Sequence, residues 1–287
     1  MKASKNQFRE NLMKTVFFVS ALTSILAVAL ICLFLFTSGM PTIREIGIFK
    51  FLLGMKWKPT NTPPSFGIFP MIIGSIYVTA GAFMVGVPIG IFTAVFLAKF
   101  CPDWLHRILK PAVELLAGIP SVVYGFFGLM VFVPFVREHF GGDGTSILTA
   151  SVLLGIMILP TVINVSEAAI RAVPESYYEG SLALGATHER SVFFTVVPAA
   201  KSGILASVVL GIGRAIGETM AVIMVAGNQA WIPDSILKGV RTLTSNIVME
   251  MGYSADLHRQ ALIATAMVLF VFIMIINLSF SYLKGRS

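Results

Sequence analysis

The chain has 287 residues, of which 56% are apolar and only 12% are charged, with a mean hydropathy of +0.86. Because soluble domains carry about 25% charged residues, this composition excludes an ordinary soluble domain and predicts a membrane protein with several spans. The net charge of +7 does not indicate a nucleic-acid partner, since no basic helix or aromatic context accompanies it. We assign the excess to loops that flank the membrane.

Six segments are apolar and long enough to cross a lipid bilayer, which takes about 20 residues in a helix. The first follows four basic residues. Its 22-residue apolar run exceeds the roughly 7 to 15 residues of a secretory signal peptide, so we predict a retained span. We therefore expect an all-α polytopic membrane protein, with spans at residues 15–36, 67–98, 112–136, 146–166, 202–228 and 260–283.

The distribution of basic residues predicts the orientation of these spans. Six spans return both termini to one side of the membrane. If the N-terminus is inside, the inner segments contain twelve Lys and Arg and the outer segments eight, with Arg214 inside a span. Because Lys and Arg concentrate on the cytoplasmic side, we expect both termini in the cytoplasm.

Prolines interrupt three of the predicted spans. The second span has 32 residues and would reach about 48 Å as a straight helix, so Pro88 is predicted to bend it. Pro120 and Pro160 interrupt the third and fourth spans. A bilayer tolerates broken backbone only beside protein or a water-filled cavity, which places these spans beside an interior path. Ordinary packing kinks are the alternative.

Two external connections are longer than a simple link requires. Residues 37–66 contain Trp57 and a proline turn cluster at 59–64, which predict a small cap with an interfacial anchor. Residues 229–259 contain a helix-like run at 235–251. We expect this second connection to form a lid over the pathway, a docking surface or a structural cap.

The fifth predicted span contains two charged residues, Arg214 and Glu218. An ionisable group at the bilayer centre costs about 2.5 to 3.5 kcal/mol, so we interpret the pair as part of a substrate pathway. In a continuous helix, residues four apart lie on one face within pairing distance. Arginine offers a planar fork to an oxyanion, and Glu218 would neutralise it in the empty site and compete with the anion, which favours release. A bridge that locks two helices is the alternative.

Other residues near the pair have weaker assignments. Gly213 and Gly217 form a small-xxx-small face, which permits close helix packing. They do not fit a dinucleotide fingerprint, because the spacing differs and no strand precedes them. Ser121, Tyr124 and Thr219 are candidates for contact with the substrate, or are simple packing residues.

Residues 174–198 predict a helix–glycine–helix hairpin. Pro174 suits a first helical turn, and Gly185 suits the left-handed residue that ends a helix. Thr187 can cap a second helix that Pro198 stops. Neither arm is long enough to span a bilayer. We expect the hairpin on the cytoplasmic surface, either in a groove of a soluble partner or against lipid headgroups.

The spacing of this hairpin resembles the cytoplasmic loop of ABC importer permeases. Glu179, Gly185 and Val197-Pro198 match the family pattern E-A-A-x-x-x-G followed by I-x-L-P. Gly180-Ser181 stands in place of the two alanines, and Thr195 in place of the isoleucine. The upstream Glu167-Ala168-Ala169 does not fit the pattern, because Val173 occupies the position of the glycine.

Two further stretches resemble phosphate ABC transporter permeases of the PstC type. They are G-R-A-I-G-E-T-M-A-V at 213–222 and A-G-I-P-S-V-V-Y-G at 117–125. The resemblance covers about residues 67–283, which form the permease core (67–287, with the hairpin at about 167–198) after a first span and loop (1–66). It implies a type I ABC importer fold in a bacterial or archaeal cell membrane.

The same resemblance implies partners and residue roles. In the family, this permease assembles with a sister permease of the PstA type, two cytoplasmic ATPase subunits and an external phosphate-binding protein. Arg214 and Glu218 would occupy the intramembrane charged positions. The coupling element that meets the ATPase would include Glu179, Ala183, Leu184, Gly185 and Pro198.

The sequence gives no indication of an enzyme. No Walker A pattern occurs, so we expect ATP to be bound by partner subunits and no cofactor by this chain. The four histidines lie in predicted loops, and His188-Glu189 lacks the second histidine of H-E-x-x-H, so no catalytic or metal-binding residues are predicted. A permease for another oxyanion, such as sulfate or molybdate, and an intramembrane enzyme are the alternatives.

Overall fold

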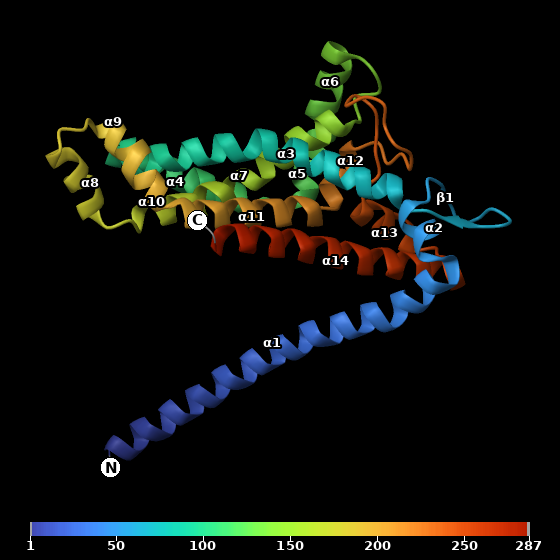
Figure 1. Cartoon of the computed structure of the whole chain (residues 1–287), viewed down its shortest axis with the longest axis horizontal. Helices are drawn as coiled ribbons and strands as arrows, with labels where there is room; N and C mark the ends of the chain where they lie inside the picture. Colours follow the sequence, from blue (N-terminus) through green and yellow to red (C-terminus); the bar gives the residue numbers. More distant parts are fainter. Residues whose placement is uncertain (1, 286–287) are drawn as a thin grey trace.

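The computed structural model describes residues 2–285 as an elongated bundle of helices with one two-stranded hairpin (Figure 1). The elements of the N-terminal half are α1 (Lys2–Ile46), α2 (Ile48–Leu53), β1 (Trp57–Lys58), β2 (Ser65–Phe66), α3 (Phe69–Val95), the π-helix η1 (Phe96–Phe100), α4 (Asp103–Gly118), α5 (Ser121–Phe127), the π-helix η2 (Gly128–Phe132) and α6 (Val133–Phe140). Those of the C-terminal half are α7 (Ile147–Arg171), α8 (Glu175–Ala183), α9 (His188–Ser191), the π-helix η3 (Val192–Val196), α10 (Val197–Ala199), α11 (Lys201–Gly217), α12 (Met220–Val225), α13 (Leu243–Met251) and α14 (Asp256–Gly285).

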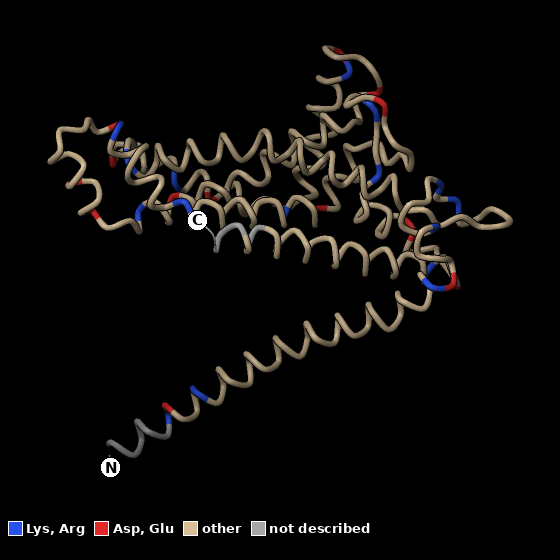
Figure 2. Tube along the Cα trace, in the orientation of Figure 1, with Lys and Arg blue, Asp and Glu red and all other residues tan. Residues whose placement is uncertain are grey.

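Within the described residues, five helical segments are long and apolar enough to cross a membrane: Arg9–Ile46, Phe69–Phe100, Ser121–Phe140, Ile147–Arg171 and Asp256–Ser279. A sixth is obtained if the bent pair His188–Ala199 and Lys201–Gly217, at 68°, is one span. Charged residues gather toward the two ends of the molecule, and the long middles of α1, α3 and α14 carry none (Figure 2). The prediction of an all-α polytopic membrane protein is confirmed.

The bundle core forms where α3, α7 and α11 pack side by side. Small residues allow this approach. A Cβ atom on Gly86 of α3 would lie 2.6 Å from the Gly155 carbonyl oxygen of α7, and one on Gly90 would lie 2.7 Å from Val162. Both helices continue through their prolines, Pro88 and Pro160, so these prolines do not end the helices.

The third predicted span is wrong in its bounds. Residues 112–136 are not one helix, because α4 ends at Gly118 and α5 begins at Ser121. Proline disfavours helical geometry in the residue before it, and Ile119 is accordingly extended, with ψ of 126°. The membrane-length segment is Ser121–Phe140, and α4 contributes no buried residue.

The first helix stands apart from the bundle. From residue 9 to residue 31 its described side chains are exposed, and only its C-terminal part packs against α14 (Figure 1). There, Gly39 lies against Ala264 and Met267, and the Phe36 and Phe270 rings meet edge to face at 6.3 Å. The helix continues to Ile46, beyond the predicted end of the first span at residue 36.

Residues 37–46 of the predicted loop are the last turns of α1, and residues 47–66 fold into a cap at one end of the bundle, with Trp57 in its core. The predicted role of Trp57 as an interfacial anchor is wrong, because its side chain is buried and its Nε1 donates to Glu250 Oε2 at 2.8 Å. Glu250 also accepts from Arg241 Nη1 at 2.6 Å and lies 2.8 Å from His258 Nε2. Burial, together with the Glu250 charge, raises the pKa of nearby Tyr253.

The connection at residues 229–259 is less helical than its sequence predicts. The helix-like run at 235–251 becomes helix only from Leu243, where α13 begins. Thr242 caps this helix by accepting the Ser245 N–H through its hydroxyl at 3.2 Å. Before that cap, Val240 pairs with Ala226 and Gly227 beside the end of α12. The connection therefore packs over the core as a structural cap.

The buried Trp57 makes a first testable prediction. Trp57→Phe removes a hydrogen bond to a charged, buried acceptor, which contributes about 1.5 to 3 kcal/mol. We expect a lower thermal unfolding midpoint for the purified protein in detergent. Trp231→Phe is the matched control because Trp231 is exposed. Equal midpoints for both variants would contradict the role of the Trp57–Glu250 bond in holding the cap.

Candidate functional site

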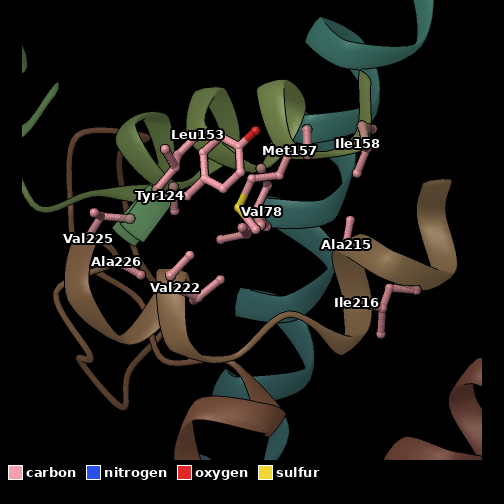
Figure 3. Packing of buried hydrophobic residues seen from close by; sticks show 14 of the residues in the cluster. Val78, Tyr124, Leu153, Met157, Ile158, Ala215, Ile216, Val222, Val225 and Ala226 are labelled. Atoms are coloured by element: carbon pink, nitrogen blue, oxygen red, sulfur yellow. The ribbon is translucent and has the colours of Figure 1, made fainter. Parts of the chain in front are cut away.

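The fifth span is broken at the charged residues that the sequence singled out. Helix α11 ends at Gly217, Glu218 is extended with ψ of 134°, and α12 begins at Met220. The chain turns between the end of α11 and the start of α12, while both helices keep apolar residues in one core (Figure 3). The prediction that Arg214 and Glu218 share one helix face is therefore wrong.

The carboxylate of Glu218 explains why the break is stable. Its Oε1 accepts hydrogen bonds from the backbone N–H groups of Thr219 at 3.0 Å and Ala221 at 3.3 Å. The first N–H groups of a helix have no partner inside the helix, and a negative charge is favourable there. The backbone carbonyl of Glu218 accepts from Thr244 at the start of α13, at 3.0 Å. Glu218 thus forms hydrogen bonds with the backbone and no ion pair with Arg214 in the described structure.

Arg214 lies in the last turn of α11 and keeps most of its hydrogen-bonding capacity. Its Nη1 donates to Thr161 Oγ1 of α7 at 3.4 Å. Among residues 2–285, no carboxylate lies within ion-pair distance of it. A guanidinium has five N–H donors, so four remain available. The alternative of an Arg214–Glu218 bridge that locks two helices is not realised in the described structure.

The two sequence stretches around Pro120 and Glu218 meet in space. A Cβ atom on Gly125 of α5 would lie 2.9 Å from Ala221 Cα of α12, so the two short helices are in close contact. Tyr124 belongs to the same apolar cluster as Val222 of α12 (Figure 3). The two motifs that are about 90 residues apart in the chain therefore form one region.

Tyr124, Ser121 and Thr219 occupy different positions in this region. The Tyr124 hydroxyl donates to the Leu116 carbonyl at 2.9 Å. In a continuous helix the N–H of residue 120 would donate to this carbonyl, but proline lacks an N–H. Thr219 donates through its hydroxyl to the Gly217 carbonyl at 3.2 Å. Ser121 is the half-buried first residue of α5. Contact of any of the three with a substrate stays a prediction.

The two glycines assigned to helix packing have no neighbour within the described chain. A Cβ atom on Gly213 or Gly217 would meet no atom within 4 Å, whereas one on Gly211 would lie 3.0 Å from Val162. Within this chain, Gly211 rather than the predicted pair brings α11 close to α7. Packing of Gly213 and Gly217 against another chain stays a prediction.

The predicted helix–glycine–helix hairpin is confirmed. Helix α8 ends at Ala183, Gly185 has a φ of +84°, and the Thr187 hydroxyl accepts the Arg190 N–H at 3.4 Å. The second arm continues through Pro198 to Ala199 before the chain turns into α11. Pro198 therefore does not stop it, since a proline is compatible with the first turn of α10.

The hairpin forms one end of the molecule (Figure 1) and is braced against the end of α3. Lys99 of η1 pairs with Glu175 at 3.1 Å and lies 5.3 Å from the centre of the Tyr178 ring. Phe100 packs edge to face on His188 at 4.7 Å. The tip is free, with Leu184 91% exposed. The predicted coupling residues Glu179, Ala183, Leu184, Gly185 and Pro198 are all exposed.

Sequence reasoning missed a buried charged cluster centred on Glu167. This carboxylate is 3% exposed and accepts from Lys110 at 2.8 Å and Arg171 at 2.9 Å, with His106 Nε2 also at 2.9 Å. Arg171 additionally donates to the Leu97 carbonyl at 2.8 Å. We call Glu167, Lys110, His106 and Arg171 the Glu167 cluster. Only the four-residue spacing of Glu167 and Arg171 signals it in the sequence, because the other partners are far away in the chain.

The fold is that of the membrane subunits of ABC transporters. A solved alginate ABC transporter in complex with its substrate-bound periplasmic protein aligns with a TM-score of 0.65, 14% identity and 94% coverage of both chains. The MetNI methionine ABC transporter aligns with a TM-score of 0.63 and 19% identity, over 76% of this chain and 95% of the other. At such identities the likeness defines the fold.

The family follows from closer relatives. Residues 86–286 match the family described as binding-protein-dependent transport system inner membrane component, and the chain belongs to this family. It is 39% identical to a probable ABC transporter permease, YqgH of Bacillus subtilis (strain 168), over 93% of this chain and 88% of the relative. It is 33% identical to the phosphate transport system permease PstC of Haemophilus influenzae, over 91% and 89%.

The hydroxyl of Tyr124 makes a second prediction. In Tyr124→Phe the Leu116 carbonyl at the helix break loses this donor, and the net loss of such a bond is about 0.5 to 1.5 kcal/mol. Thermal unfolding in detergent should show a destabilised protein. Tyr77→Phe is the control, since the Tyr77 hydroxyl makes no hydrogen bond with the described residues and its side chain is exposed. An unchanged midpoint for Tyr124→Phe would refute the proposed stabilisation of the break.

Proposed function

We propose that this chain is the permease subunit of an ATP-driven importer of inorganic phosphate, with Arg214 in the translocation path. Family membership and the PstC relatives support the transport role. The observation that carries the site is the guanidinium of Arg214, which lies in the last turn before a helix break with four of its five donors available. Such a group matches the oxygens of a phosphate.

The hydrogen bonds of Glu218 favour a role in transport other than neutralisation of Arg214. Its carboxylate holds the start of α12 and leaves the arginine unpaired. A conducting site must bind an ion strongly enough to admit it and weakly enough to release it. A fixed negative charge close in sequence to Arg214 makes the site shallower for an anion, and this favours onward movement.

Energy for import comes from other subunits. The exposed hairpin tip around Leu184 and Gly185 is the surface that meets the ATPase, of which the assembly contains two cytoplasmic subunits, and this chain hydrolyses no ATP itself. A sister permease of the PstA type forms the other wall of the path, and an external phosphate-binding protein delivers the substrate. The chain binds no cofactor of its own.

The hairpin also supports an orientation in the membrane. Both the N-terminal end of α1 and the C-terminal end of α14 point toward the end of the molecule that carries α8 and α9 (Figure 1). If the hairpin meets a cytoplasmic ATPase, both ends of the chain are cytoplasmic. The cap with Trp57 then faces outward, where the binding protein docks.

Replacing Arg214 tests the pathway. In Arg214→Ala, the loss of charge-assisted bonds to phosphate, about 1.5 to 3 kcal/mol, is expected to slow phosphate uptake roughly 10- to 100-fold. The measurement is uptake by the complete transporter in proteoliposomes, with ATP hydrolysis followed in the same vesicles. We expect Arg214→Lys to be intermediate, because it keeps the charge and loses the planar fork.

Arg259→Ala is the matched control, because Arg259 is exposed and its side chain makes no hydrogen bond or ion pair with the described residues. Normal uptake by Arg214→Ala would exclude the pathway role. Continued ATP hydrolysis without uptake separates a blocked path from a failure to assemble. Competition by sulfate or molybdate for wild-type uptake would indicate a different oxyanion as the substrate.

A pair of glycines in the hairpin tests the coupling role. Gly180 and Gly185 both have open space around an added Cβ, but only Gly185 has a positive φ. A left-handed conformation costs a residue with a Cβ about 1 to 2 kcal/mol. We expect Gly185→Ala to lower both co-purification of the ATPase subunits and phosphate uptake severalfold, and Gly180→Ala to have little effect. Equal behaviour of the two variants would refute a requirement for this hairpin shape.

A further inference from the structure

A stripe of polar side chains runs along the half of α7 that leads to the hairpin. Thr161, Asn164, Glu167 and Arg171 are spaced by three or four residues, which places them on one face of the helix. Thr161 accepts from Arg214 at 3.4 Å. Glu167, the centre of the Glu167 cluster, is six residues beyond Thr161, which corresponds to about 9 Å along the helix at 1.5 Å per residue. The stripe therefore connects Arg214 with that cluster.

Lys110 joins the stripe from α4. Its Nζ donates to Asn164 Oδ1 and to Glu167 Oε2, both at 2.8 Å. The ammonium has three donors, so one remains available. The side chain of Lys110 is 26% exposed and that of Arg171 48%, whereas Glu167 is 3% exposed. The two cations are thus partly exposed, whereas the carboxylate between them is buried.

The charges of the Glu167 cluster do not balance. Lys110 and Arg171 each carry a positive charge, Glu167 carries the one negative charge, and no second carboxylate lies within ion-pair distance of these cations in the part of the chain that the structure describes. The cluster is therefore positive by at least one unit, even with His106 neutral. A partly buried surplus of positive charge is costly without an anion. An oxyanion offers the matching charge and several acceptor oxygens.

We infer that the Glu167 cluster is a second anion site, on the cytoplasmic side of Arg214, which takes inorganic phosphate as it leaves the transporter. This inference rests on the proposed function. The phosphate oxygens accept hydrogen bonds from the remaining N–H groups of Lys110 and Arg171. Asn164 lies beside the path between the two sites. Glu167 competes with phosphate for the same cations and keeps the binding weak enough for release.

The test compares two positive residues of α4. Lys110→Gln removes a cation of the cluster. Arg107→Gln is its control, because Arg107 is exposed and makes no hydrogen bond or ion pair with the described residues. Both variants are assayed as the complete transporter in proteoliposomes, with the hairpin side facing the lumen. Initial phosphate uptake is measured against increasing inorganic phosphate loaded into the lumen.

Phosphate in the lumen occupies the second site and slows uptake in the wild type and in Arg107→Gln. For Lys110→Gln we expect about a 10-fold slower uptake without luminal phosphate, and about a 10-fold higher luminal phosphate for half inhibition, as for the loss of one charge-assisted interaction. Lys110→Arg restores both quantities. If Lys110→Gln does not assemble, Arg171→Gln is used with the same readout and the same direction of shift.

Each other outcome overturns the inference. Lys110→Gln and Arg107→Gln with equal inhibition curves would show that the cluster binds no phosphate. A slower Lys110→Gln with an unchanged inhibition curve would show that the cluster only joins α4 to α7. In both cases normal wild-type uptake leaves the proposed function intact. Absence of phosphate uptake by the wild type would instead refute the proposed function.

Discussion

The structure depends on one constraint, which is that broken backbone inside a membrane must find its hydrogen-bond partners within the protein. The chain breaks two helices, at Pro120 and at Glu218, and provides a side chain for each break. Tyr124 donates to the Leu116 carbonyl, and Glu218 accepts the N–H groups at the start of α12. The short helices that follow the two breaks, α5 and α12, then pack against each other.

This arrangement determines the state of Arg214. A carboxylate four residues along a continuous helix would pair with the arginine and cancel its charge. Because the helix ends at Gly217, the Glu218 carboxylate accepts hydrogen bonds from backbone N–H groups instead. An arginine with a single long hydrogen bond to Thr161 is a poor structural lock and a good partner for an anion. The break therefore leaves Arg214 available for the anion that we propose as its partner.

Sequence reasoning found features with local causes. The left-handed Gly185 and the Thr187 cap follow from the properties of single residues, and they predict the hairpin. The break at Pro120 has a similarly local cause. It failed where distant residues decide. Trp57 looks like an interfacial anchor until Glu250 is seen beside it. Glu167 belongs to a stretch that did not fit the coupling pattern, and its partners Lys110 and His106 come from another helix.

The connections of the hairpin suggest how a partner's movement reaches the path. Lys99 and Phe100 tie the hairpin to α3, and Arg171, three residues before Pro174, ties its start to η1 and to Glu167. Beyond the second arm, the chain bends by 68° and enters α11. The last turn of α11 contains Arg214. A force on the hairpin tip therefore acts on α7 and α11 together. Since Thr161 and Arg214 lie on these two helices, any sliding of one past the other changes the surroundings of the proposed anion site.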